Sequence, residues 1–201
     1  MKRLIFKFLN ESFNIETFVL LLFCFITNCS VMHSVQDIDK FRLIGNIPSR
    51  VQEKENTCGI NSLYMAISYW DNTISYEDVS KYFKKQNDKG ISTIEMLLVA
   101  KKLGYNAEIK KIDYNELLLR LKGEEPIILL IGNKPKVYER ILEEKNVDLT
   151  TYHYVVAIGY SIDEKKILLN TGSKKMKCIN NKDLESCWIV TDYTSVIVTK
   201  K

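Results

Sequence analysis

Residues 52–70 read QEKENTCGINSLYMAISYW, and the rest of the chain is organised around this stretch. From Cys58 onward its apolar residues recur with helical spacing, at Ile60, Leu63, Tyr64, Ile67 and Trp70. The pattern predicts an amphipathic helix that begins at the cysteine. A thiol at a helix N-terminus lies at the positive end of the helix dipole, which lowers its pKa. Cys58 is therefore a candidate nucleophile, and a buried structural cysteine is the alternative.

Two neighbours of Cys58 fit the chemistry of a nucleophile. Gly59 has no side chain, so a substrate backbone could approach the sulfur closely. Gln52 lies six residues upstream and carries an amide donor that could reach an oxyanion beside Cys58. The stretch thus combines a candidate nucleophile with a candidate oxyanion donor.

A thiol nucleophile needs a base, and the chain has only two histidines. His33 lies close to an N-terminal apolar segment, whereas His153 opens the apolar run 153–160, which is typical of a buried strand. A second run, 166–170, ends at Asn170, and the five residues between the runs, Ser161-Ile162-Asp163-Glu164-Lys165, predict a hairpin. Asn170 would then lie near His153 and orient its imidazole, as in a Cys-His-Asn site. The alternatives are an ordinary strand-end histidine and a turn asparagine.

Several motifs follow one another in an order that resembles a known family. They are Gln52-x5-Cys58-Gly59, Leu63-Tyr64-Met65-Ala66, Gly90-Ile91-Ser92, Lys102-Leu103-Gly104-Tyr105, Pro126-Ile127-Ile128-Leu129 and His153-Tyr154-Val155-Val156. The series resembles the bacteriocin-processing (double-glycine) peptidase family, and most closely its free-standing lipoprotein branch. The resemblance covers residues 46–201.

The resemblance implies a papain-like fold and cleavage of peptides, typically leader peptides after paired glycines. It implies that Cys58 is the nucleophile, His153 the base, Gln52 the oxyanion donor and Asn170 the orienting residue. It implies no metal or organic cofactor. The chain departs from the family at one point, because many members have Asp-Pro where this chain has Asn170-Thr171.

The rest of the domain predicts helices first and strands second, which indicates an α+β fold with N-terminal helices packed on a C-terminal antiparallel sheet. Capping patterns and apolar spacing predict further helices at 75–85, 92–103 and 113–123, and a short one from 181. Strands are predicted at 127–131, 154–160, 166–170, 176–179 and 195–199. The charged segment 132–152 includes a candidate helix at 137–145 and is either a rim over the cleft or a plain surface insertion.

The N-terminus has the pattern of an export signal. Lys2, Arg3 and Lys7 precede the apolar run 18–27, which is shorter than the ~20 residues of a membrane-spanning helix. Residues 26–29 resemble a lipobox, so we expect a lipoprotein signal at 1–28, lipidation at Cys29 and a tether at 29–45 before the peptidase domain at 46–201. An uncleaved anchor and an ordinary cleaved signal are the alternatives. All three signals place the domain outside the cytoplasm. The lipoprotein signal and the uncleaved anchor also attach it to a membrane of the cell envelope.

Cysteine usage and charge narrow the class further. A disulfide between Cys178 and Cys187 would suit an oxidising compartment, and two reduced core thiols are the alternative. The absence of a CxxC motif argues against a zinc site. The formal net charge is +4 and no arginine-rich run is interleaved with aromatics, which argues against nucleic-acid binding.

These features together predict an exported, membrane-anchored cysteine peptidase acting on a peptide or protein, with an exporter as a candidate partner. The sequence contains no phosphate-binding loop of the Walker type, so we expect no use of ATP by this chain. Two alternatives use the same residues differently. One is a catalytically silent module that binds peptides, and the other is an acyl or peptide transferase that uses thioester chemistry.

Overall fold

Helix α2 (Cys58–Trp70) begins at the residue that the sequence predicted. The computed structural model describes residues 38–83, 90–132 and 152–201, which all belong to the unit 33–201. Two further helices follow, α3 (Tyr76–Ser80) and α4 (Thr93–Lys102). Each begins with a complete capping box, Ser75 with Asp78 and Ser92 with Glu95. Helix α3 is shorter than the predicted 75–85, and residues 84–85 lie outside the described residues.

Seven strands form one antiparallel sheet with the order β2-β7-β3-β4-β5-β6, and β1 pairs with β4 off this path. The strands are β1 (Phe41–Leu43), β2 (Asn106–Lys111), β3 (Ile127–Ile131), β4 (His153–Ser161), β5 (Lys166–Asn170), β6 (Lys177–Asn180) and β7 (Thr194–Thr199). The predicted strands at 127–131, 154–160, 166–170, 176–179 and 195–199 are therefore confirmed, whereas β1 and β2 were not predicted.

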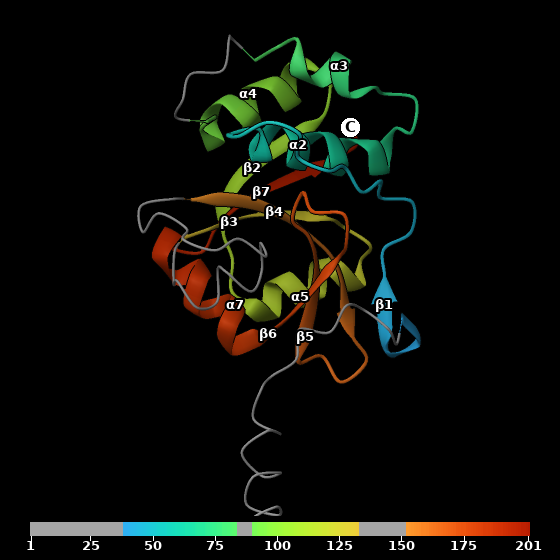
Figure 1. Cartoon of the computed structure of the whole chain (residues 1–201), viewed down its shortest axis with the longest axis vertical. Helices are drawn as coiled ribbons and strands as arrows, with labels where there is room; N and C mark the ends of the chain where they lie inside the picture. The colour runs from blue at the N-terminus through green and yellow to red at the C-terminus, as the bar shows by residue number, and fades with distance from the viewer. Residues whose placement is uncertain (1–37, 84–89, 133–151) are drawn as a thin grey trace, which may run out of the picture. The chain divides into compact units, whose positions relative to one another are not determined.

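Helices cover both faces of the sheet (Figure 1). On one face, α2, α3 and α4 pack on residues such as Ile128 and Val156. On the other face lie α5 (Tyr114–Lys122) and α7 (Asn181–Trp188), where Leu184 and Trp188 are fully buried as expected. The short 3-10 helices are η2 (Ile38–Lys40) and η3 (Ile189–Thr191). The α+β prediction with N-terminal helices on an antiparallel sheet is confirmed, with a second helical layer added.

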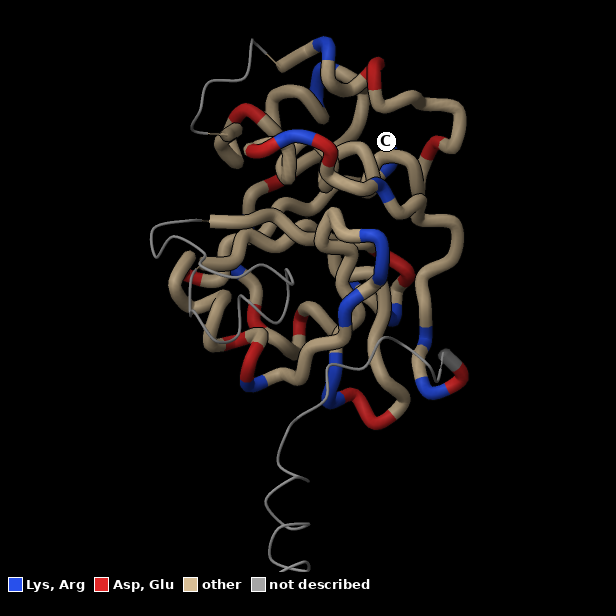
Figure 2. Tube along the Cα trace, viewed as in Figure 1, with Lys and Arg blue, Asp and Glu red and all other residues tan. Residues whose placement is uncertain are grey.

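The central strands β3 and β4 carry no Lys, Arg, Asp or Glu, whereas these residues are spread over the helices and turns around them (Figure 2). Charge on the outer elements and apolar residues on both faces of the inner strands are what a sheet buried on both sides requires. Within the described residues, no helix is both long and apolar enough to cross a membrane. The predicted signal at 1–28 and the candidate helix at 137–145 lie outside those residues.

The structure bears on the tether boundary and on the two cysteines whose pairing was left open. The last residues of the expected tether at 29–45 belong to the folded domain. Strand β1 (Phe41–Leu43) pairs with β4, and the Ile44 main-chain N–H donates to the Ile158 carbonyl at 2.8 Å. Of the two alternatives for Cys178 and Cys187, the structure has two free thiols and no disulfide. Cys178 packs against the core on the α2 face, whereas Cys187 belongs to the core on the α7 face, so the sheet separates them.

Candidate active site

The Cys58 thiol lies at the first turn of α2 and is only partly accessible. Burial raises its pKa, but a hydrogen bond with His153, the charge of that ring, and main-chain hydrogen bonds from Tyr154 and Gly59 outweigh burial. The pKa of Cys58 is therefore lowered, as a reactive cysteine requires. The structure thus brings together the two residues that the sequence singled out as nucleophile and base.

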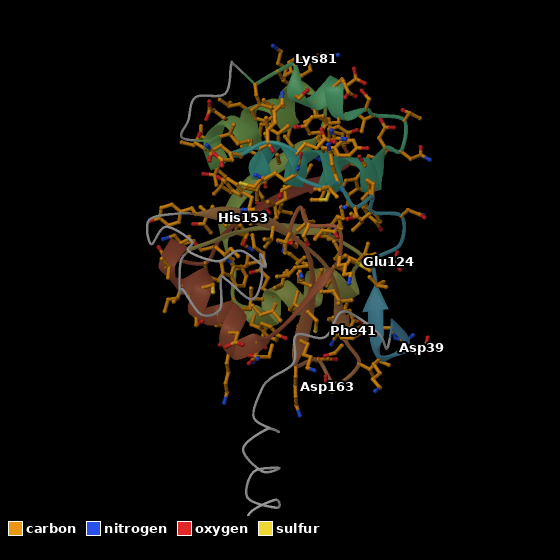
Figure 3. The ribbon with its side chains drawn as sticks, in the orientation of Figure 1. Asp39, Phe41, Lys81, Glu124, His153 and Asp163 are labelled. Carbon is orange, nitrogen blue, oxygen red and sulfur yellow. The ribbon has the colours of Figure 1, made fainter. Side chains whose placement is uncertain are left out.

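His153 is the first residue of β4 and pairs with Ile131 of β3. Its side chain lies between the layer of α2–α4 and the strands, far from the β4–β5 turn that carries Asp163 (Figure 3). The ring atom Nε2 is 3.0 Å from the Thr171 carbonyl oxygen. A carbonyl oxygen can only accept, so Nε2 carries the proton and Nδ1 is left with the lone pair. Nδ1 is then the nitrogen that can take a proton from the thiol.

Two hydrogen bonds fix the position of Gln52, one from its main chain and one from its side chain. Its main-chain N–H donates to the Gly172 carbonyl at 2.7 Å, and its side-chain Nε2 donates to the Lys54 carbonyl at 3.0 Å. An amide nitrogen has two hydrogens, so one remains for an oxyanion. Gly172 has φ +81°, a left-handed conformation that favours glycine, and its Cα faces the Gln52 side chain. The turn after β5 thereby fixes the position of Gln52.

Asn170 ends β5, is 3% exposed and pairs with Val156 rather than with His153. The carbonyl oxygen that lies 3.0 Å from the Nε2 atom of His153 belongs to the next residue, Thr171. The expectation that the Asn170 carboxamide orients the ring stays a prediction. Asn170 remains close in the chain to that carbonyl and is buried beside it.

A pocket of about 360 Å³ lies beside Gln52 and His153. Its lining consists of residues 51–55, His153 and residues 171–173. His153 connects the pocket to the thiol, since it lines the pocket and is hydrogen-bonded to Cys58. Among the described residues no group of three His, Cys, Asp or Glu side chains could hold a metal ion. The arrangement suits nucleophilic attack on a carbonyl group within the pocket.

Two residues at the site were not predicted from the sequence. Tyr154 supplies a main-chain hydrogen bond to the Cys58 sulfur, and its side chain is hydrogen-bonded to Thr93 at the start of α4. Burial raises the pKa of the Tyr154 hydroxyl, with the nearby Cys58 thiolate as a second cause, so this phenol stays protonated. Ile91 packs against Gly59, where a side chain would collide with it. The contacts of Tyr154 could not be predicted from the apolar run 153–160, because a tyrosine that only fills the core of a buried strand gives the same sequence pattern.

The sequence profile of the Peptidase_C39 like family matches residues 44–196, so the chain belongs to that family. The fold is papain-like. No curated protein matches the sequence significantly.

Solved structures share the fold at low sequence identity. A putative C39-like peptidase from Bacillus anthracis is 17% identical, with a TM-score of 0.62, and the alignment covers 81% of this chain and 99% of that one. The peptidase domain of Streptococcus ComA, a bi-functional ABC transporter involved in quorum sensing, is 17% identical with a TM-score of 0.57, covering 76% and 97%. A double glycine motif protease from an AMS/PCAT transporter, in complex with the leader peptide, is 17% identical with a TM-score of 0.54, covering 77% and 91%.

Proposed function

We propose that this protein is a cysteine peptidase in which Cys58 and His153 cleave a peptide bond. The observation that carries the proposal is the contact between the two side chains, with the Cys58 pKa lowered and His153 held by the Thr171 carbonyl. A module that only binds peptides has no need of an activated thiol. Membership of the peptidase family supports the same reading.

In the first half of the reaction, the Cys58 sulfur attacks the scissile carbonyl carbon and His153 holds the thiol proton. The carbonyl oxygen becomes an oxyanion, and we expect the free amide hydrogen of Gln52 and the Cys58 main-chain N–H to stabilise it. When the tetrahedral intermediate collapses, the C–N bond breaks and His153 gives its proton to the leaving amine. The remaining acyl group is a thioester on Cys58.

In the second half, His153 takes a proton from water, and the hydroxide attacks the thioester. The C–S bond breaks, the carboxylic acid product leaves, and the sulfur regains its proton through His153. Asn170 acts as a positioning residue, because it precedes the carbonyl that orients the imidazole. Throughout both steps the Nε2–H···O=C bond keeps the reactive Nδ1 toward the sulfur.

Leader peptides are the substrate class that we propose. The protease from the AMS/PCAT transporter was solved with a leader peptide bound, and the ComA domain belongs to a transporter. The same fold and family in this chain support a substrate of that kind, cut after paired glycines, with an exporter as the partner that handles the product.

We further propose that this protein belongs to the lipoprotein branch, with its signal at 1–28 removed and Cys29 lipidated. The apolar run 18–27 followed by the lipobox-like residues 26–29 supports the proposal. Metabolic labelling with a fatty-acid analogue should mark the wild type and not Cys29→Ala. Membrane retention of both without label would instead support an uncleaved anchor.

The peptidase proposal is tested with peptides that contain a Gly-Gly pair, incubated with purified protein and followed by mass spectrometry. We expect cleavage by the wild type, none by Cys58→Ala or His153→Ala, and a loss of about 100- to 1,000-fold for Gln52→Ala. A melting curve for each variant separates lost chemistry from lost folding. Unchanged biological activity of Cys58→Ala would establish a binding module instead.

A further inference from the structure

A second pocket, of about 390 Å³, lies beside the catalytic one. Its walls come from residues 50–54, the first turns of α2 and the helix α3. Val51, Glu53 and Lys54 line both pockets, so this short segment separates them. Neither Cys58 nor His153 lines the second pocket, and the steps derived above make no use of it.

Asn61 supplies an unused donor to this pocket. The residue is 2% exposed, and its Nδ2 has no hydrogen-bond partner within the described parts of the chain. Helix α2 does not need this side chain, because the Asn61 main-chain N–H already donates to the Thr57 carbonyl at 2.9 Å. Buried polar groups in native proteins are almost always paired, and an orphaned one destabilises the fold. An acceptor in the pocket would satisfy this amide.

Arg50 supplies a second donor with a fixed position. Its guanidinium carbon lies 3.6 Å from the centre of the Tyr76 ring, which holds the planar group against an aromatic face. No ion pair to Arg50 is present among the described residues. The acidic residues of the pocket, Glu53 and Glu77, are both exposed, and both act electrostatically on the Tyr76 hydroxyl, to which Arg50 is hydrogen-bonded. The pocket lining therefore offers two donors, the buried Asn61 amide and the charged Arg50 guanidinium, beside these exposed carboxylates.

We propose that this pocket binds a carboxylate. A guanidinium presents paired N–H donors that match the two oxygens of a carboxylate, and the Asn61 amide would add a third donor. The carboxylate comes either from an acidic residue of a peptide or from a small free acid. The proposal does not depend on cleavage by Cys58, since it concerns binding alone.

The test uses the full-length protein in detergent, labelled with ¹⁵N at asparagine, and follows the Asn61 side-chain resonances by NMR. N-acetylglutamate, its neutral analogue N-acetylglutamine and the peptide acetyl-Gly-Glu-Gly-amide are titrated separately. We expect a saturable shift with a carboxylate probe and binding of the neutral analogue weaker by about tenfold or more. A response to both acids identifies a site for any carboxylate, and a response to the peptide alone identifies a site for acidic peptides.

Variants assign the binding to the two donors. Arg50→Gln should weaken binding of the acid by about tenfold or more, whereas Arg42→Gln, a matched change at an exposed arginine of β1, should not. Asn61→Leu removes the Asn61 side-chain resonances, so binding to this variant is measured by calorimetry and should be weaker. The variant should also have a higher Tm, because it removes an orphaned polar group. The proposal fails if glutamine binds as tightly as glutamate, if Arg42→Gln weakens binding as much as Arg50→Gln, or if no probe saturates the pocket.

Discussion

Gly59 lies where the structure leaves no room for a side chain. A Cβ at this position would be 2.5 Å and 2.7 Å from two side-chain atoms of Ile91 and 3.2 Å from the Tyr154 ring. Those distances are too short for real contacts, so Ile91 would have to move and Tyr154 would be crowded. Because the Tyr154 main chain is hydrogen-bonded to the Cys58 sulfur, crowding at residue 59 would reach the nucleophile. The glycine is therefore needed by the protein's own packing.

We therefore expect Gly59→Ala to lower both the stability and the peptidase activity, with a stability loss of about 1–3 kcal/mol from overpacking. Gly45→Ala is the matched control, since nothing lies within 4 Å of a Cβ at that position. Urea unfolding and cleavage rates measure the two effects. A Gly59→Ala protein with the stability and rate of Gly45→Ala would show that the contact with Ile91 does not constrain the site.

The imidazole of His153 contacts the main-chain carbonyl of Thr171, and this contact has a consequence for mutagenesis. Thr171→Ala keeps the carbonyl that accepts from Nε2, so we expect nearly full activity. Asn170→Ala disturbs the end of β5 and should lower kcat, but by less than His153→Ala, which removes the base itself. Cleavage rates beside melting curves measure both. A loss in Asn170→Ala as large as in His153→Ala would mean that the carboxamide, not the carbonyl, orients the ring.

How far the sequence predicts this site depends on which atoms carry each role. The contact between Cys58 and His153 was predictable, because it belongs to side chains whose residue types and spacing are visible in the sequence. The oxyanion role of Gln52 stays a prediction. The carbonyl of Thr171 was not predictable, since any residue has one. Its position depends on the irregular register between Ala157 and Gly159, which shifts β5 along β4.

Among the elements, the helices that begin with capping boxes were the most predictable. The Ser92 side chain accepts from the Glu95 main-chain N–H at 3.2 Å, and the Glu95 carboxylate accepts from the Ser92 main-chain N–H at 2.8 Å. Both bonds are local, so the sequence alone specifies them. Strand β2 was not predicted, because its local sequence does not have a clear strand pattern. It is an edge strand with charged residues and its Ile109 is 39% exposed, so its apolar alternation is weak.

Ser92→Ala should destabilise the protein by about 1 kcal/mol, because the N-terminal N–H groups of α4 lose a partner. Ser49→Ala is the control, since Ser49 is an exposed serine that caps no helix. The free energy of unfolding in urea gives both values. Equal stability of the two variants would contradict the capping role. The effect on activity should be small unless the Thr93 contact with Tyr154 is disturbed as well.

At the scale of the whole molecule, the sheet divides the unit into two apolar cores. One core lies under α2, α3 and α4, and the other under α5 and α7. The sequence predicted which strands are buried but not that helices cover both faces, because buried apolar runs do not show which helix covers them. The site lies at the boundary between the first helical layer and the strands, where α2 and β4 each begin (Figures 1 and 3).

Cys178 and Cys187 belong to different cores, which keeps the two thiols apart. Because the sheet lies between them and no disulfide joins them, a reductant should leave the Tm of the folded unit unchanged. Differential scanning fluorimetry with and without the reductant tris(2-carboxyethyl)phosphine measures this. A lower Tm in the reduced sample would reveal a cross-link that the structure does not contain.

The pairing of Cys58 with His153 is tested most directly by the pH dependence of Cys58 alkylation, read residue by residue with mass spectrometry. The thiolate is the reactive form, and the pKa of Cys58 is lowered, so its alkylation should persist as pH falls below the ordinary thiol value of about 8.5. Burial raises the pKa of Cys178, which should therefore react slowly at neutral pH. In His153→Ala, the interactions with His153 that lower the Cys58 pKa are lost, whereas burial, which raises it, remains. The pH profile of Cys58 alkylation should therefore move to higher pH. Identical Cys58 profiles in wild type and His153→Ala, or Cys58 reacting no faster than Cys178 at neutral pH, would contradict the account.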